Sequence, residues 1–197
     1  MDTDIKNAVS ALKNGGIVIF PTDTVYGIGC RIDDQDAVNR LYKIRSRPHS
    51  QASPVLASNL SMLDPYIAPL SQEIIEKLVT PYWAGALTIV VRCKPNKVIS
   101  AVRGGTDTIG VRVPNHLITL EIINGLGVPI IGTSANLRGG RTPLSVEDLD
   151  YTLIQQADYV VPGKCYKKEA STIVDVTHKP WKVLRQGAID LSNVIFP

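Results

Sequence analysis

The chain has 197 residues, of which 44% are hydrophobic and 20% charged, and its formal net charge is +3. This size and composition fit one folded domain with a hydrophobic core, and the small positive charge permits an anionic ligand without requiring one. No apolar run is long enough to span a bilayer, and the N-terminal stretch lacks the basic and apolar regions of a secretory signal. The three cysteines form no C-x-x-C pair, which argues against a zinc site and a disulfide framework. We therefore expect a cytoplasmic protein with reduced thiols and no membrane partner.

Helices and strands alternate in the first part of the sequence, and strands predominate near its end. Asp4, Ser71 and Ser145 are the predicted N-caps of their helices, and a second helix starts near Asp34. In chain order, hydrophobic spacing and β-branched runs predict helix 4–16, strand 17–20, helix 34–47, strand 53–58, helix 71–83, strands 86–93 and 107–114, helix 116–127, strand 128–136, helix 145–154, and strands 157–163, 171–177 and 181–187. The expected fold is a single α/β domain over residues 1–197, with a mixed sheet.

Four polar loops follow predicted strands, which is where sheets of this kind bind ligands. The first, PTDTVYGIG, places two threonines, Thr22 and Thr24, and two glycines, Gly27 and Gly29, directly after strand 17–20. Hydroxyls both donate and accept hydrogen bonds, and glycines let the backbone approach a ligand closely. Taken alone, however, this pattern is more typical of a capped turn than of a binding site.

The second loop, RSRPHSQASP, carries Arg45 and Arg47, with Arg40 and Lys43 just upstream. Cations at the end of a helix complement the helix dipole, and guanidinium groups also match phosphate oxygens, so both interpretations are open. A spacing of two residues does not put both arginines on one helix face. It suits a frayed helix end, where two guanidinium groups can converge on one polyanion.

The third and fourth loops add an arginine and a hydroxyl-rich turn. Arg112 alternates with Val111 and Val113 on strand 107–114, and a buried arginine must be paired, either with an internal aspartate or with a ligand carboxylate. The fourth loop, GTSANLRGGRTP, brings Ser134 and Asn136 together with glycines, a mixture expected of a nucleotide or anion cradle. It lacks the spacing of a P-loop.

No residue is placed for an evident nucleophile–base pair, and the three histidines follow no metal-ligand spacing. The candidate site therefore consists of arginine, threonine, serine and asparagine side chains, which bind and orient anions better than they transfer protons. This set favours phosphoryl or nucleotidyl chemistry, in which positioning and electrostatic stabilisation provide most of the catalysis.

Several segments that occur in order between Ile17 and Ile189 resemble those of the YrdC-like family, the threonylcarbamoyl-adenylate synthases. The segments are FPTDTVYGIG, LYKIRSRP, WAGALTIVV, TIGVRVPNH, GTSAN, STIVD and LRQGAI. The resemblance implies a short, single-domain nucleotidyltransferase with a twisted open α/β sheet flanked by helices and a basic concave groove. It implies condensation of L-threonine, bicarbonate or CO2, and ATP into threonylcarbamoyl-AMP, with release of pyrophosphate.

The resemblance also implies a cellular role and a set of ligands. The product would serve the threonylcarbamoyladenosine modification of tRNA, through downstream threonylcarbamoyl transferase proteins. Mg²⁺ would accompany ATP, with no metal ligand from protein side chains and no tightly bound cofactor. No catalytic residue is assigned.

The residues that match the family motifs divide into two groups. Those expected to contact threonine are Thr24, Ser58, Arg112 and Gly132. Those expected to contact ATP are Lys43, Arg45, Arg47, Ser53, Thr108, Ser134, Asn136, Thr142 and Arg185.

The sequence departs from the family pattern mainly between Arg45 and Ser58. Arg45 stands where the family has lysine, although Lys43 is close enough to substitute for it, and two residues are inserted before Pro54. Ser53 stands where many members have asparagine, and Ser58 where many have histidine. Elsewhere, a threonine at position 142 replaces the usual serine.

Two other functions compete with the synthase. The first is a YrdC-like paralogue that binds double-stranded RNA or tRNA through its basic cluster and has no synthase activity; such binding would weaken steeply with salt. The second is a transferase that uses carbamoyl phosphate and needs no threonine. The intact TSAN and PTDTVYG segments favour the synthase.

Overall fold

The computed structural model describes residues 2–137 and 139–195. Its strands are β1 Val18–Phe20, β2 Gly27–Gly29, β3 Val55–Leu56, β4 Leu87–Arg92, β5 Thr108–Arg112, β6 Ile130–Ile131, β7 Thr133–Ser134, β8 Tyr159–Val160, β9 Thr172–Asp175 and β10 Lys182–Arg185. They form a four-stranded sheet in the order β7-β2-β1-β8 and a six-stranded sheet in the order β10-β9-β4-β5-β3-β6. Both sheets are open and contain parallel and antiparallel pairs. The predicted mixed α/β fold is confirmed, with two sheets where one was expected.

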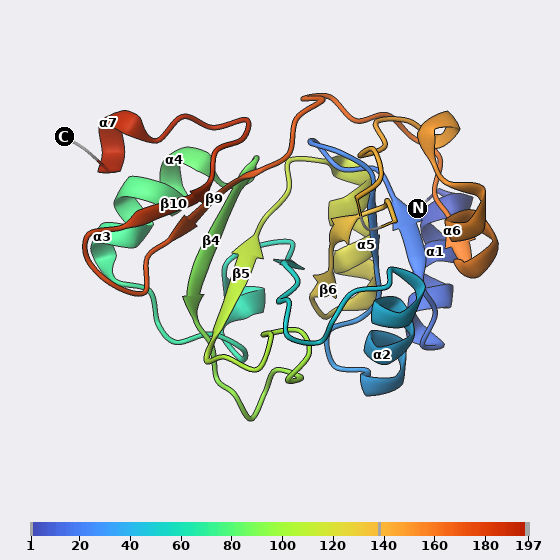
Figure 1. Cartoon of the computed structure of the whole chain (residues 1–197), viewed down its shortest axis with the longest axis horizontal. Helices are drawn as coiled ribbons and strands as arrows, with labels where there is room; N and C mark the ends of the chain where they lie inside the picture. Colours follow the sequence, from blue (N-terminus) through green and yellow to red (C-terminus); the bar gives the residue numbers. More distant parts are fainter. Residues whose placement is uncertain (1, 138, 196–197) are drawn as a thin grey trace.

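Helices cover the sheets on two sides of the molecule. They are α1 Thr3–Lys13, α2 Gln35–Ile44, α3 Gln72–Ile74, α4 Thr80–Tyr82, α5 Leu117–Leu126, α6 Tyr151–Gln156 and α7 Ser192–Ile195, with 3₁₀ turns at Ser61–Leu63 and Val146–Asp148 and a π turn at Ile75–Val79. Figure 1 shows α3, α4 and α7 beside β4, β9 and β10, whereas α1, α5 and α6 lie at the opposite side, around β1. No helix within the described ranges has both the length and the apolar character that crossing a membrane requires.

Local capping explains where the helices begin. The cap of α1 is Asp2, whose side chain accepts a hydrogen bond from Asp4 N (3.2 Å), so the prediction of Asp4 was wrong by half a turn. Ser71 caps the predicted helix 71–83, which continues through α3, the π turn and α4. The predicted helix 145–154 is split instead, because Asp150 begins a new helix, α6, by accepting from Thr152 N at 2.8 Å.

The predicted loop after strand 17–20 contains a strand of its own. In the structure β2 pairs antiparallel with β1, with Phe20 opposite Gly27, so Pro21–Tyr26 is the connection of a hairpin. A Cβ atom on Gly27 would lie 2.9 Å from the Phe20 ring, which explains why the strand contains glycine. Gly-Ile-Gly has little strand propensity, and only its partners make it a strand.

The two sheets meet where β2 ends. Ile131 N donates to Cys30 O at 2.8 Å, and Arg31 forms a β-bridge with Ile130, so the chain beyond β2 lies against β6. Only Gly132 separates β6, in the six-stranded sheet, from β7, in the four-stranded one. The segment 130–134 therefore passes from one sheet to the other and carries the GTSAN loop to their junction.

This junction leaves no room for a side chain at Gly29. A Cβ atom there would lie 1.6 Å from the backbone oxygen of Ile131, and backbone cannot move aside as a side-chain end can. We expect Gly29→Ala to lower the free energy of unfolding by about 3 kcal/mol or more, as measured by urea denaturation. Gly127→Ala is the control: Gly127 has φ +82° but open space around it, so the loss should be roughly 1 kcal/mol. Equal losses for the two variants would contradict the steric explanation.

All three cysteines are buried free thiols, as the sequence predicted. Burial raises the pKa of Cys30, and the negative charges of Asp34 and Asp33 raise it further. Burial also raises the pKa of the Cys93 and Cys165 thiols. At neutral pH all three therefore stay protonated, which makes them poor nucleophiles.

Candidate functional site

Two cavities adjoin at the junction of the sheets. The larger, of about 370 Å³, is lined by Arg45, Arg47, Pro48, Gln51, Ser134, Asn136 and Gly139. The smaller, of about 110 Å³, is lined by Thr24, Val25, Pro54, Leu56, Thr88, Arg112, Gly132, Ser134, Thr142, Ala170, Ser171 and Arg185. Ser134 lines both, so the two cavities share a wall.

Arg112 is the most buried cation of the smaller cavity, with only 5% of its surface exposed. Its Nε donates to Gly85 O (2.9 Å), its Nη1 donates to Thr24 Oγ1 (3.0 Å), and its Nη2 forms an ion pair with Asp23 Oδ1. A guanidinium group carries five N–H donors, so among the described residues two remain without an acceptor, one on each terminal nitrogen. The internal aspartate predicted as one possible partner is therefore present, and Arg112 still keeps two donors for a ligand.

Thr24 presents a hydrogen-bond acceptor to the same cavity. A carbonyl oxygen only accepts, so the hydroxyl of Thr22 must donate to Val25 O (2.7 Å). The contact between the Thr22 and Thr24 hydroxyls (2.9 Å) is then a donation from Thr24. Thr24 Oγ1 accepts from Arg112 with one lone pair. Its second lone pair has no donor among the described residues and is available to a ligand. The loop is thus a capped turn and a cavity wall at once.

Arg185 adds a second cation to the smaller cavity. Its Nε and Nη2 donate to Ser171 O (3.0 and 2.7 Å), and Ser171 Oγ lies 2.9 Å from Thr88 Oγ1. No carboxylate within the described residues pairs with Arg185. Burial lowers the pKa of Arg112, Asp23 opposes that shift, and the positive charge of Arg185 adds to it. The cavity therefore has excess positive charge.

The larger cavity contains two arginines that have no acidic partner among the described residues. Arg45 donates to Asn136 O through Nε (3.1 Å) and Nη2 (2.8 Å), and Arg47 donates to the backbone oxygens of Gln51 and Ala52. Burial, together with the neighbouring charge of Arg47, lowers the pKa of Arg45 to about 10, so both side chains stay protonated at neutral pH. Two partly desolvated cations without a counter-ion favour an anionic ligand.

The wall between the cavities is held by side-chain hydrogen bonds. Ser134 Oγ donates to Asn136 Oδ1 (2.6 Å), and Asn136 Nδ2 donates to Gly140 O (2.7 Å). Arg45 also donates to Asn136 Oδ1 (3.2 Å). These hydrogen bonds link the loop that carries Ser134 and Asn136 to Arg45.

Comparison with known proteins identifies the family of the chain. The family model Sua5_yciO_yrdC, described as telomere recombination, matches residues 10–187. The chain belongs to the Sua5/YciO/YrdC family. It is 33% identical to the threonylcarbamoyl-AMP synthase of Bacillus subtilis (strain 168) over 82% of this chain and 46% of that protein.

Two further members of the Sua5/YciO/YrdC family have solved structures. Sua5 of Pyrococcus abyssi, solved in complex with L-threonine, is 30% identical, with a TM-score of 0.90 over 96% of this chain and 56% of that one. Escherichia coli YciO is 26% identical, with a TM-score of 0.81 over 95% of this chain and 90% of that one. The chain thus spans about half the length of the synthases it matches.

The structure brings together most residues that the family motifs single out. The predicted residues that line a cavity are Thr24, Arg45, Arg47, Arg112, Gly132, Ser134, Asn136, Thr142 and Arg185. The predicted residues outside both linings are Lys43, Ser53, Ser58 and Thr108. Their roles in binding stay predictions.

The four outlying residues have other surroundings. Lys43 is exposed on α2, and the Ser53 hydroxyl lies 2.7 Å from Tyr42 Oη. Ser58 Oγ lies 3.7 Å from the sulfur of Met62, and Thr108 Oγ1 lies 3.2 Å from Thr106 Oγ1.

Sequence reasoning missed three contributors. Thr88 and Ser171 line the smaller cavity, and Ser171 Oγ contacts both Thr88 Oγ1 and Arg185 Nη2. In the sequence, Thr88 is only part of a predicted buried strand, and Ser171 is only the first residue of the STIVD segment. Asp23 lies in the first loop, but no local pattern identifies its partner, Arg112. Side chains alternate between the two faces of a strand, so the sequence does place Thr88 on the opposite face from Leu87 and Ile89. No sequence pattern indicates which neighbouring strand Thr88 contacts.

Proposed function

We propose that this protein condenses L-threonine, bicarbonate or CO2, and ATP into threonylcarbamoyl-AMP and pyrophosphate. One observation carries the proposal: a small cavity with a free guanidinium fork shares a wall, Ser134, with a larger cavity that holds two unpaired arginines. The first suits an amino acid and the second suits a polyphosphate. The names of the B. subtilis and P. abyssi relatives support the same reaction.

The smaller cavity has complementary groups for threonine. The two free N–H groups of Arg112 match the two oxygens of a carboxylate. The free lone pair of Thr24 matches the amino or hydroxyl group of the ligand. A Cβ atom on Gly132 would lie 2.3 Å from Leu56 Cδ1, so a larger residue at this position would displace Leu56, which also lines the cavity. This cavity, at about 110 Å³, is the smaller of the two and suits the smaller substrate.

The larger cavity has complementary charge for ATP. Arg45 and Arg47 would neutralise phosphate oxygens, and Ser134 and Asn136 would hold the nucleotide near the shared wall. Mg²⁺ would enter bound to the phosphates, because the polar lining groups are two arginines, one hydroxyl and two amides, which suit phosphate better than a metal ion. The ion would supply further neutralisation of the phosphate charge.

The reaction then proceeds in two steps. The threonine amine attacks CO2, forming an N–C bond and releasing a proton to solvent, to give a carbamate. From bicarbonate, the same N–C bond forms with loss of water instead of a proton. A carbamate oxygen attacks the α-phosphorus of ATP, and the bond to the bridging oxygen of the β-phosphate breaks, releasing pyrophosphate. Arg112 and Arg185 would reduce the repulsion between the carbamate and the phosphates of ATP. Holding the two reactants next to each other would supply the rest of the rate acceleration through proximity. No general base is required from the protein.

The cellular role follows from this chemistry. Threonylcarbamoyl-AMP is an activated acyl donor, so the proposal includes a downstream transferase that moves the threonylcarbamoyl group to tRNA. It also places the protein in the cytoplasm. Binding of tRNA or double-stranded RNA to the basic groove is a separate property, which the assay below distinguishes.

The test is pyrophosphate release by the purified protein with threonine, bicarbonate and ATP. We expect release only when all three are present, and thermal stabilisation that is larger with ATP plus threonine than with either alone. Release that does not depend on threonine would exclude the synthase. Turnover of carbamoyl phosphate without threonine would indicate the transferase instead. Salt-sensitive RNA binding in a protein without turnover would indicate the RNA-binding alternative.

A further inference from the structure

Asp23 is a buried carboxylate beside the smaller cavity but not part of its lining. Only 2% of its surface is exposed, and its Oδ1 forms the ion pair with Arg112. Its Oδ2 is buried and has no hydrogen-bond partner among the described residues. The carboxylate therefore interacts with one cation and keeps one oxygen unsatisfied.

Such an arrangement is unfavourable as a means of stabilising the fold. Removing a carboxylate and a guanidinium group from water costs several kcal/mol per ion, which their attraction repays only when the remaining hydrogen bonds are made. An unsatisfied buried oxygen adds to that cost. Two apolar side chains of similar volume would stabilise the same position better. A contribution to the free energy of unfolding therefore does not explain the presence of this ion pair.

The geometry around Arg112 supplies that reason. Three acceptors from separate positions hold its guanidinium group: Gly85 O, the Thr24 hydroxyl and the Asp23 carboxylate. They define the plane of the group and leave one donor free on each terminal nitrogen. Of the three, only Asp23 is charged, so its hydrogen bond contributes most to the orientation.

Asp23 is itself fixed from the other side. Its backbone oxygen accepts from Lys167 N at 2.9 Å. Lys167 belongs to the segment that connects β8 to β9, and His116 contacts this segment twice. Its Nε2 donates to Lys164 O (3.1 Å), and its ring stacks on the Tyr166 ring with 5.2 Å between the ring centroids. The Asp23 backbone is thus tied to the chain that leads into β9.

We propose that Asp23 is the positioning residue of Arg112, and that it directs the two free N–H groups toward the carboxylate of the amino-acid ligand. The proposal rests on the proposed function for the identity of that ligand. It assigns Asp23 no contact with substrate and no proton transfer.

The test compares Asp23→Asn with Asp33→Asn in the full chain. Asp33 is the control, because it also pairs with one arginine, Arg31, here through two hydrogen bonds (2.6 and 2.9 Å) and on the surface. We expect Asp23→Asn to raise the Kd and KM for threonine roughly 10-fold, while the KM for ATP changes less than about twofold. Asp33→Asn should change neither constant.

Asp23→Glu separates orientation from charge. It keeps the negative charge but displaces it by one methylene group, so threonine affinity should fall here too. This variant also keeps the proposal testable if Asp23→Asn does not fold.

Three results would overturn the proposal. One is threonine binding at wild-type strength or tighter in Asp23→Asn or Asp23→Glu, which would mean that threonine affinity does not depend on how Asp23 holds Arg112. Another is an equal rise of both KM values together with a loss of unfolding free energy, which would mean a purely structural role. In both cases the proposed function would stand. Wild-type protein that fails to bind threonine would overturn the proposed function and this inference together.

Discussion

Arg112→Lys is expected to weaken threonine binding by roughly 100-fold and to leave ATP binding close to that of the wild type. Lysine keeps the positive charge and can still pair with Asp23. It has no planar fork, so it cannot hold Gly85 O and Thr24 while presenting two parallel N–H groups to a carboxylate. Isothermal calorimetry with threonine, and separately with ATP, measures both affinities.

The control for this substitution is Arg31→Lys, which changes another arginine that binds a carboxylate through two hydrogen bonds. Arg31 lies outside both cavities, and its pair with Asp33 is partly exposed, so both affinities should stay at the wild-type value. If Arg112→Lys weakens threonine binding no more than Arg31→Lys does, Arg112 does not hold the carboxylate.

Arg45→Ala is expected to raise the KM for ATP by roughly 100-fold and to slow pyrophosphate release, with threonine affinity changed far less. The substitution removes one of two partly buried cations that have no acidic partner among the described residues. It also removes the hydrogen bonds from Arg45 to the backbone oxygen and the side chain of Asn136, in the wall between the two cavities. Steady-state kinetics with each substrate varied in turn distinguishes the two constants.

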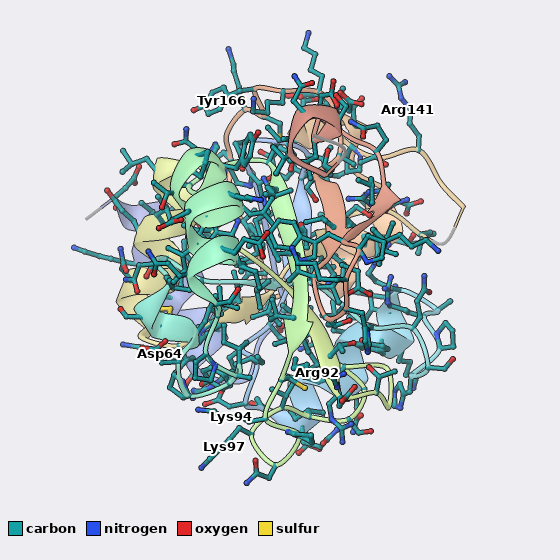
Figure 2. All side chains as sticks on the ribbon, turned by 90° about the vertical axis from the view of Figure 1, so that its left-hand side faces the viewer. Asp64, Arg92, Lys94, Lys97, Arg141 and Tyr166 are labelled. Carbon is teal, nitrogen blue, oxygen red and sulfur yellow. The ribbon has the colours of Figure 1, made fainter. Side chains whose placement is uncertain are left out.

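Lys97→Ala controls for the loss of one positive charge. Lys97 is exposed on the loop after β4, close to Lys94 at one end of the molecule (Figure 2). A general decrease in net charge would affect both variants alike, whereas a phosphate contact is lost only with Arg45. An ATP KM that responds equally to the two substitutions would therefore contradict a local role for Arg45.

The elements that could be predicted from the sequence are those determined locally. Ser71 and Asp34 cap their helices, and the β-branched run of β4 forms a strand, because each depends on neighbours within a few residues. The strand β2 and the division into two sheets could not be predicted. Gly-Ile-Gly has little strand propensity, and β2 forms through its partners, the neighbouring β1 and the distant β7. The division into two sheets depends on contacts between residues about one hundred positions apart, such as Cys30 with Ile131.

The same distinction holds for the candidate site. Residue types and spacing indicated an anion site and drew attention to Arg45, Arg47 and Arg112. The pairing of Arg112 with Asp23 joins positions 89 residues apart, and no local pattern encodes it. The exposure of Lys43 and the burial of Ser53 likewise depend on how α2 and the following loop pack, which motif matching does not describe.

The shared wall at Ser134 has a thermodynamic consequence. Ser134 lines both cavities, and the Asn136 side chain joins it to Arg45. Under the proposed function, the two substrates would therefore bind to sites that share one hydrogen-bonded wall. Binding equilibria around a closed cycle must balance, so whatever factor ATP applies to the affinity for threonine, threonine applies to the affinity for ATP. Any cooperation between the substrates would therefore be equally strong in both directions.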